Sequence, residues 1–125
     1  MPIPPLLAAE AFLTLVWTRL LLRIAPRRTL RLAIAQRDGG HTPDRHLLDT
    51  FARVAAWTPI GHTCMHRALA LQRILARRGT HARLCLGIGE KPRMFPGHAW
   101  LEVAGHVIND APEVIGRYRR MSFSR

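Results

Sequence analysis

The chain has 125 residues, 48% of them hydrophobic and 22% charged, which fits one soluble domain with a single core. Nineteen Lys and Arg against eight Asp and Glu give a net charge of +11, which attracts nucleic acid, anionic lipid or acidic peptides without choosing among them. Two cysteines are too few for a disulfide framework, and the N-terminus lacks the basic start of a secretory signal. The uncharged run 11–18 is shorter than the ~20 apolar residues of a membrane span. We therefore expect a cytoplasmic protein.

The first forty residues predict a helical region. Pro5 suits the first turn of a helix over residues 6–24, which Pro26 ends. Most of this helix is apolar, so it should be covered on several sides, within the domain or by a partner protein. The arginines that follow leave a membrane-surface role open. A short second helix is expected over residues 30–35, and the sequence Asp-Gly-Gly at 38–40 predicts a break.

Two further helices are predicted before the sequence pattern changes. Thr42-Pro43 is typical of a cap followed by a first-turn proline, and helical spacing of apolar residues extends this third helix to about Trp57. Thr63 can cap a fourth helix, and Gly79 is a natural C-terminal stop.

Beyond Gly79 the pattern becomes strand-like. Residues 82–89 and 98–103 alternate between apolar and other side chains, with a loop expected between them. Ala104-Gly105 predicts a turn, and residues 106–110 a return strand. Helices grouped before strands predict an α+β fold, with a small antiparallel sheet after the fourth helix.

Three residues of this pattern suit nucleophilic catalysis. Cys64 follows the cap residue Thr63, where free amides and the helix dipole favour a thiolate. His98 begins a strand and can take the thiol proton and return it to a leaving amine. Asp110 ends the return strand and can hold the imidazole in the useful tautomer. The oxyanion hole would use the amide of Cys64 and a second donor, for which His62, Thr63 and Trp57 are candidates.

The register of the hairpin decides whether His98 and Asp110 meet. A two-residue turn at 104–105 would place His98 opposite Ala111, with Asp110 on the other face of the sheet. A three-residue turn with Gly105 in the left-handed region would pair Glu102 with His106 and His98 with Asp110. We favour the second turn because Ala is a poor residue for positive φ. The same count excludes Asn109, which would point to the opposite face.

Other interpretations use the same residues. His62, Cys64 and His66 with His98 could bind zinc, but their spacing fits no familiar zinc pattern, so we expect no metal and no cofactor. Cys85 lies within a strand and is expected to be structural. The same triad could serve an acyl transferase, or the chain could be a non-enzymatic basic module that binds a peptide or nucleic acid. The RNA option lacks interleaved aromatic and basic residues.

The segments 64–72, 77–79, 98–103 and 109–110 resemble the leader peptidases of lasso-peptide biosynthesis. These enzymes belong to the transglutaminase-like, papain-related cysteine peptidase superfamily. The Cys64-Met65-His66 and His98-Ala99-Trp100 motifs carry most of the resemblance, and the Leu- and Arg-rich opening is also similar.

The resemblance implies a function and a set of partners. The substrate would be a ribosomally made precursor peptide, cut between leader and core by Cys64, His98 and Asp110. A separate leader-recognition protein would deliver it, because the chain has no room for a fused recognition domain, and an ATP-dependent cyclase would act next. We therefore expect residues 1–40 to dock a partner and residues 41–125 to form the peptidase core, in one compact unit. Nucleic acid is not an expected partner.

Overall fold

The computed structural model describes residues 4–41, 43–58, 63–89, 97–109 and 118–120. Its helices are α1 (Pro5–Ile24), α2 (Pro26–Ala35), α3 (Arg45–Trp57) and α4 (Cys64–Arg77). Its strands are β1 (Gly39–Gly40), β2 (Thr80–His81), β3 (Arg83–Gly89), β4 (Gly97–Val103), β5 (His106–Val107) and β6 (Tyr118–Arg120). The α+β fold predicted from the sequence is confirmed.

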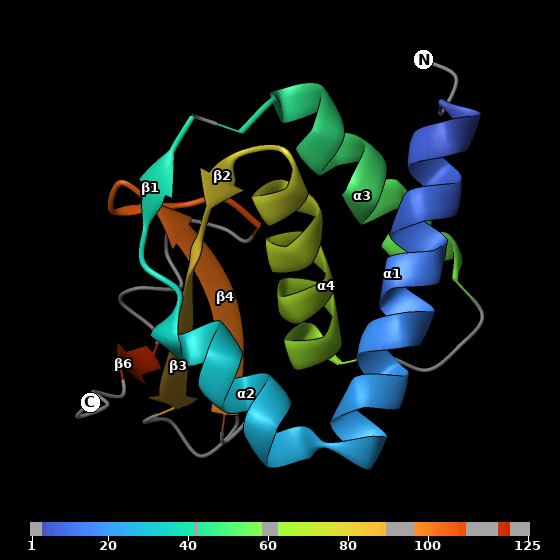
Figure 1. Ribbon diagram of the computed structural model, residues 1–125. Coiled ribbons are helices and arrows are strands. Elements are labelled where there is room, and N and C mark those ends of the chain that lie inside the picture. Colours follow the sequence, from blue (N-terminus) through green and yellow to red (C-terminus); the bar gives the residue numbers. More distant parts are fainter. Residues whose placement is uncertain (1–3, 42, 59–62, 90–96, 110–117, 121–125) are drawn as a thin grey trace.

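The strands form an antiparallel sheet in the order β5-β4-β3-β6, and a separate two-stranded sheet pairs β1 with β2. Figure 1 shows α4 at the centre of the molecule, with the strands on one side and α1 and α3 on the other. This arrangement explains why α4 has apolar residues on most of its surface. Five consecutive residues, 68–72, are buried because neighbours cover the helix from several directions.

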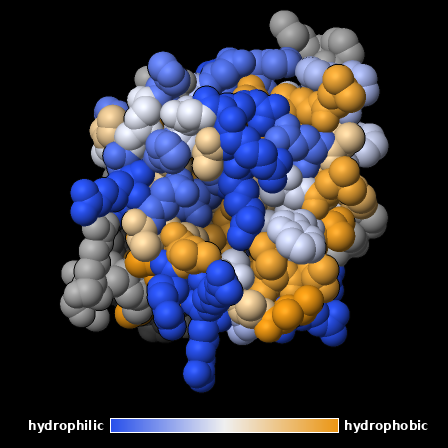
Figure 2. All heavy atoms as spheres, in the orientation of Figure 1, coloured by the Kyte–Doolittle hydropathy of each residue, from blue (hydrophilic) through white to orange (hydrophobic). Residues whose placement is uncertain are grey.

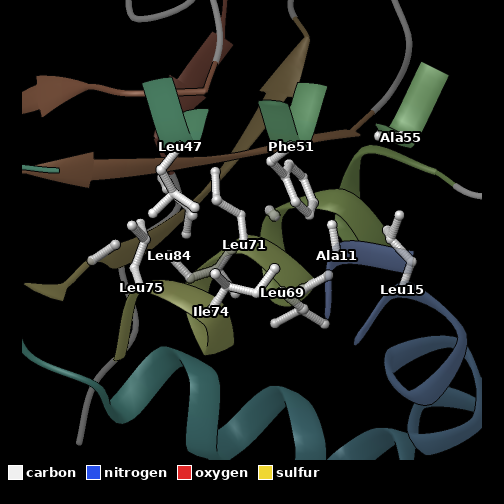
Figure 3. Close-up of a cluster of buried hydrophobic side chains, with 14 of the residues drawn as sticks. Ala11, Leu15, Leu47, Phe51, Ala55, Leu69, Leu71, Ile74, Leu75 and Leu84 are labelled. Atoms are coloured by element: carbon white, nitrogen blue, oxygen red, sulfur yellow. The ribbon is translucent and has the colours of Figure 1, made fainter. Parts of the chain in front are cut away.

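The core gathers around α4 (Figure 3). Leu69 and Leu71 of this helix, Leu15 of α1, Phe51 of α3 and Leu84 of β3 are all less than 5% exposed. The strands on one side of α4 and the helices α1 and α3 on its other side therefore share one core. Its ion pairs add to this packing, because Glu10 contacts Arg77 and Arg78 at the end of α4.

The second helix is longer than expected. Pro26 does end α1 at Ile24, but it is also the first residue of α2, which begins there instead of at residue 30. A proline fits the first turn of a helix, where its missing N–H has no partner to lose. One residue therefore ends one helix and starts the next.

The expected cap of α3 was also misplaced. The helix begins at Arg45, and its cap is Asp44, whose carboxylate accepts from the backbone N–H of His46 at 3.1 Å. Asp is preferred to Thr as an N-cap, so the local preference agrees with the observed position of the cap. Pro43 precedes the cap, and Thr42 lies outside the described residues.

Three short strands, β1, β2 and β6, were not predicted. The expected break at Gly39–Gly40 is β1, which pairs with Thr80–His81, and the basic tail contributes β6, which pairs with β3. Gly40 has a φ of +92°, and a Cβ there would overlap the carbonyl oxygen of Gly79, so only glycine fits. The expected loop between the long strands falls largely on residues 90–96, outside the described part of the chain.

The helix α1 is long and apolar enough to cross a membrane by length and composition, with a mean hydropathy of 1.5 over an 18-residue window. Counting only the uncharged run 11–18 underestimated this length. A core helix of a soluble protein can meet the same measure. In this structure α1 buries Ala11, Thr14, Leu15 and Thr18, and Figure 1 shows it beside α3 and α4.

Candidate active site

The start of α4 is fixed by a reciprocal cap. The hydroxyl of Thr63 accepts from the backbone N–H of His66 at 3.4 Å, and the backbone N–H of Thr63 donates to His66 Nδ1 at 3.0 Å. This capping box usually has Glu or Gln where His66 stands. Cys64, half-buried and free, is the first residue of the helix, as the sequence predicted. Its sulfur therefore lies where the helix dipole favours an anion.

His98 is the second residue of β4 and is held by its strand neighbours. Its ring stacks against Trp100, with centroids 6.0 Å apart and planes 27° apart. Trp100 is fully buried, and its Nε1 donates to Glu102 at 2.8 Å. The row His98, Trp100 and Glu102 lies on one face of the strand, so the buried indole supports the imidazole. The alternating pattern of residues 98–102 indicates that His98 and Trp100 share a face of the strand, and the stacking of their rings could have been predicted from it.

Cys64 and His98 line the same cavity, which has a volume of about 300 Å³. Its walls come from α3, the first turns of α4, the start of β4 and residues 108–109. Two of the three predicted catalytic residues are therefore brought to one site by elements separated in the sequence. Asp110 lies outside the described residues, so its role stays a prediction.

The predicted hairpin register is wrong. Val103 pairs with His106 and Glu102 with Val107, around a two-residue turn in which Ala104 has a φ of +51° and Gly105 a φ of +80°. Positive φ at both positions matches the twist of the strands, although it costs alanine about 1–2 kcal/mol. A distant contact offsets this cost, because the backbone N–H of Ala104 donates to Asp38 Oδ2 at 2.7 Å.

The return strand also ends earlier than expected, because β5 stops at Val107. The N–H of Ile108 still donates to the carbonyl of Leu101 at 3.1 Å, but the N–H of Leu101 donates to Asn109 Oδ1 at 2.8 Å instead of to a backbone carbonyl. The side chain of Asn109 thereby replaces the last backbone acceptor of the strand pair, and Asn109 also lines the cavity. The register count that excluded Asn109 in favour of Asp110 no longer holds.

The remaining predicted residues have other surroundings. Cys85 is 3% exposed and packs against Trp100, as expected of a structural cysteine. Trp57 is 84% exposed, and Thr63 is engaged in the cap, so neither is an evident oxyanion donor. His62 lies outside the described residues. In the described part of the chain, no group of three or more His, Cys, Asp or Glu side chains could hold a metal ion.

Comparison with known proteins identifies the family of this chain. Residues 6–122 match the family model of the Transglutaminase-like superfamily. A segment of 51 residues is 45% identical to the microcin J25-processing protein McjB of Escherichia coli, and it amounts to 41% of this chain and 24% of that protein. No solved structure matches the chain significantly. Since the family match extends over nearly the whole sequence, the chain belongs to the transglutaminase-like superfamily.

Proposed function

We propose that this chain is a cysteine peptidase that cuts a ribosomally made lasso precursor peptide between its leader and its core. The observation that carries the proposal is the shared cavity of Cys64, at the start of α4, and His98, at the start of β4. A thiol at a helix N-terminus and an imidazole that line one cavity are the two groups that nucleophilic catalysis of this kind requires.

In the proposed reaction the imidazole of His98 takes the thiol proton of Cys64. The thiolate then attacks the carbonyl carbon of the scissile bond, and the backbone N–H of Cys64 donates to the developing oxyanion. His98 returns the proton to the leaving amine, which frees the amino terminus of the core. Water, activated by the same imidazole, hydrolyses the thioester. The observed two-residue turn removes the register argument for Asp110. Its proposed role, to orient the imidazole as the third residue of a triad does, rests on the family resemblance alone.

The proposed substrate class rests on the relative. The microcin J25-processing protein McjB shares 45% identity over a segment of 51 residues. We extend its processing role to this chain, with a precursor peptide as substrate, a separate leader-recognition protein and an ATP-dependent cyclase as partners, and the cytoplasm as the place of reaction.

The N-terminal region, residues 1–40, is the proposed docking surface for the recognition protein. Large apolar side chains of α1 remain in solvent, with Leu13 63%, Trp17 51% and Ile24 72% exposed. Figure 2 shows hydrophobic side chains gathered over the part of the surface where α1 lies. An exposed apolar patch of this kind is typical of an interaction site.

The test is cleavage of a precursor peptide in the presence of the recognition protein, followed by mass spectrometry. The wild-type enzyme should release the leader, whereas Cys64→Ala and His98→Ala should not. Cys85→Ala and His106→Ala, which remove the same groups outside the cavity, are the matched controls. Cleavage that survives Cys64→Ala would overturn Cys64 as the nucleophile, and a wild-type protein that releases no leader would favour a non-enzymatic binding module.

The family match supports a second candidate, because transglutaminase-like proteins include acyl transferases. In that case an amine, not water, would attack the thioester. The mass of the released leader distinguishes the two reactions. Hydrolysis leaves a free carboxylate at its C-terminus, and transfer leaves an amide.

A further inference from the structure

A second cavity, of about 320 Å³, lies between α2 and α4 and shares no lining residue with the cavity of Cys64 and His98. Ala33 of α2 and Leu69 and Gln72 of α4 line it and are buried, so they form its floor. Leu32, which is 60% exposed, and the exposed Arg77 line its outer part. The cavity is therefore a hollow that is open to solvent.

The polar side chains of this second cavity differ in what they bind. The amides of Gln36 and Gln72 donate to backbone carbonyls at 3.1 and 3.0 Å, and the hydroxyl of Thr29 donates to another at 3.5 Å. Arg73 is half-buried, and within the described part of the chain it makes no hydrogen bond and no ion pair. Burial, and then the positive charge of Arg77, lower the pKa of Arg73 below its usual value. An arginine stays charged all the same, so the wall of the cavity carries an unneutralised guanidinium.

The neighbouring arginines of α4 show which group this row of side chains binds. Arg77, one turn after Arg73, donates to Glu10 Oε2 at 2.7 Å, and Arg78 donates to both carboxylate oxygens at 2.6 and 3.1 Å. Both oxygens of Glu10 are thus occupied by Arg77 and Arg78. A carboxylate from outside the chain could therefore do for Arg73 what Glu10 does for the next turn of the helix.

The surface around the cavity is both basic and apolar. The helices α1, α2 and α4 carry two, three and three arginines, with Glu10 as their one acidic residue. Leu32 at the cavity and Leu13 and Trp17 of α1 are exposed. Figure 2 shows a hydrophilic area over α4 next to hydrophobic side chains over α1. The phosphates of nucleic acid would match only the charge, whereas a protein surface with an acidic side chain among apolar ones matches both properties.

We infer that the cavity between α2 and α4 receives an aspartate or glutamate side chain of the leader-recognition protein, whose carboxylate pairs with Arg73. A planar guanidinium can hold a carboxylate with two parallel hydrogen bonds, which fixes orientation as well as affinity. The inference rests on the proposed docking of that protein on residues 1–40 and names the chemistry of the contact. The contact should set the affinity for the partner and leave the reaction at Cys64 unchanged.

Arg73 and Arg31 offer a matched pair of variants. Arg31 is exposed on α2 and does not line the cavity. Arg73→Gln and Arg31→Gln each remove one positive charge, so they weaken long-range attraction equally and differ in the local contact. Arg73→Lys keeps the charge but loses the planar pair of donors. Because Arg77 repels Arg73, Arg73→Gln should not lower the thermal midpoint, whereas a structural role for Arg73 would lower it.

The experiment measures the Kd between the whole chain and the recognition protein by isothermal titration calorimetry. Arg73→Gln should raise the Kd roughly tenfold, which lies between the effects of exposed and buried charge pairs. Arg31→Gln should change the Kd less than twofold, and Arg73→Lys should lie between the two. At a saturating concentration of the recognition protein, Arg73→Gln should release the leader at the wild-type rate. Replacing one acidic residue of the recognition protein by arginine should restore tight binding to Arg73→Glu.

Equal Kd values for Arg73→Gln and Arg31→Gln would overturn the inference while the docking proposal stands. Binding to phosphatidylglycerol vesicles that is lost in Arg73→Gln, with an unchanged Kd for the recognition protein, would also overturn it and assign the cavity to a lipid headgroup. A wild-type chain that does not bind the recognition protein would overturn the docking proposal and this inference together. Binding that depends on Arg73 without any release of leader would instead support the inference and overturn the proposed peptidase activity.

Discussion

The side chain of Asn109 makes the last hydrogen bond between the two segments of the hairpin, so its removal should lower the free energy of unfolding. Its Oδ1 accepts the backbone N–H of Leu101 at 2.8 Å, and Leu101 is completely buried. In Asn109→Ala this backbone N–H loses its hydrogen-bond partner. A buried, unsatisfied donor costs about 1–3 kcal/mol, and we expect the free energy of unfolding to fall by this amount.

The variant Asn109→Asp keeps an acceptor oxygen at the same place. Its stability should lie within about 1 kcal/mol of the wild type, because the hydrogen bond survives and gains charge assistance. Urea denaturation followed by circular dichroism measures both variants, with a common slope as the check for two-state unfolding. His106→Ala, on the exposed face of the same hairpin, is the control and should be nearly neutral.

Loss of this hydrogen bond should also reduce activity. Asn109 lines the cavity beside Cys64 and directly precedes Asp110, so its anchor fixes the path of the chain at the proposed site. We expect kcat/KM to fall in Asn109→Ala and to be largely retained in Asn109→Asp. If Asn109→Ala is as stable as the wild type, or if Asn109→Asp is equally damaged, the side chain does not have this role.

Three further predictions concern the packing that supports the site. Gln72→Met should lower the free energy of unfolding, measured by urea denaturation, by about 1–2 kcal/mol. The buried amide of Gln72 donates to the carbonyls of Ala33 and Ala82 at 3.0 Å each, and the loss is limited because both carbonyls keep a second donor from Gln36. An unchanged free energy of unfolding would contradict this account. Gly40→Ala should lower the thermal midpoint by several degrees, through its positive φ and the overlap with a backbone carbonyl, whereas Gly39→Ala, with open space around its Cβ, should not. Glu10→Gln tests the contact of α1 with α4. Hydrogen bonds from Arg78 and then Arg77 outweigh desolvation and hold the pKa of Glu10 below its usual 4.5, so the carboxylate stabilises the fold above that pH and loses this effect as the pH falls through its lowered value. The half-exposed arginines limit the gain to about 1 kcal/mol. Glu10→Gln should therefore be less stable than the wild type at pH 7, and this difference should shrink as the pH is lowered below 4.5. A difference that does not change with pH would count against the ion pair.

The features that the sequence predicted correctly are local ones. The ends of α1 and α4 follow from Pro26, Thr63 and Gly79, whose preferences act within one helical turn. The position of Cys64 follows from Thr63 in the same way. The alternation of β3 and β4 follows from successive side chains that point to opposite faces of the sheet, which a period of two reports directly. Both faces of β4 are buried from Ala99 to Val103, which the alternation did not indicate.

The features that the sequence did not predict depend on distant contacts. The type of turn at Ala104 depends on a hydrogen bond to Asp38, 66 residues earlier, which no local pattern contains. The pairing of β1 with β2 likewise joins residues far apart. The error in the register then led to the exclusion of Asn109, because one shifted residue moves every side chain to the other face.

The most direct test of the account is the rate at which iodoacetamide alkylates Cys64 near neutral pH, measured by peptide mass spectrometry. If the imidazole across the cavity takes the thiol proton, His98→Ala should slow the alkylation several-fold, whereas His106→Ala should leave it unchanged. Equal rates in the wild type and in a folded His98→Ala variant would contradict the claim that these two side chains act together.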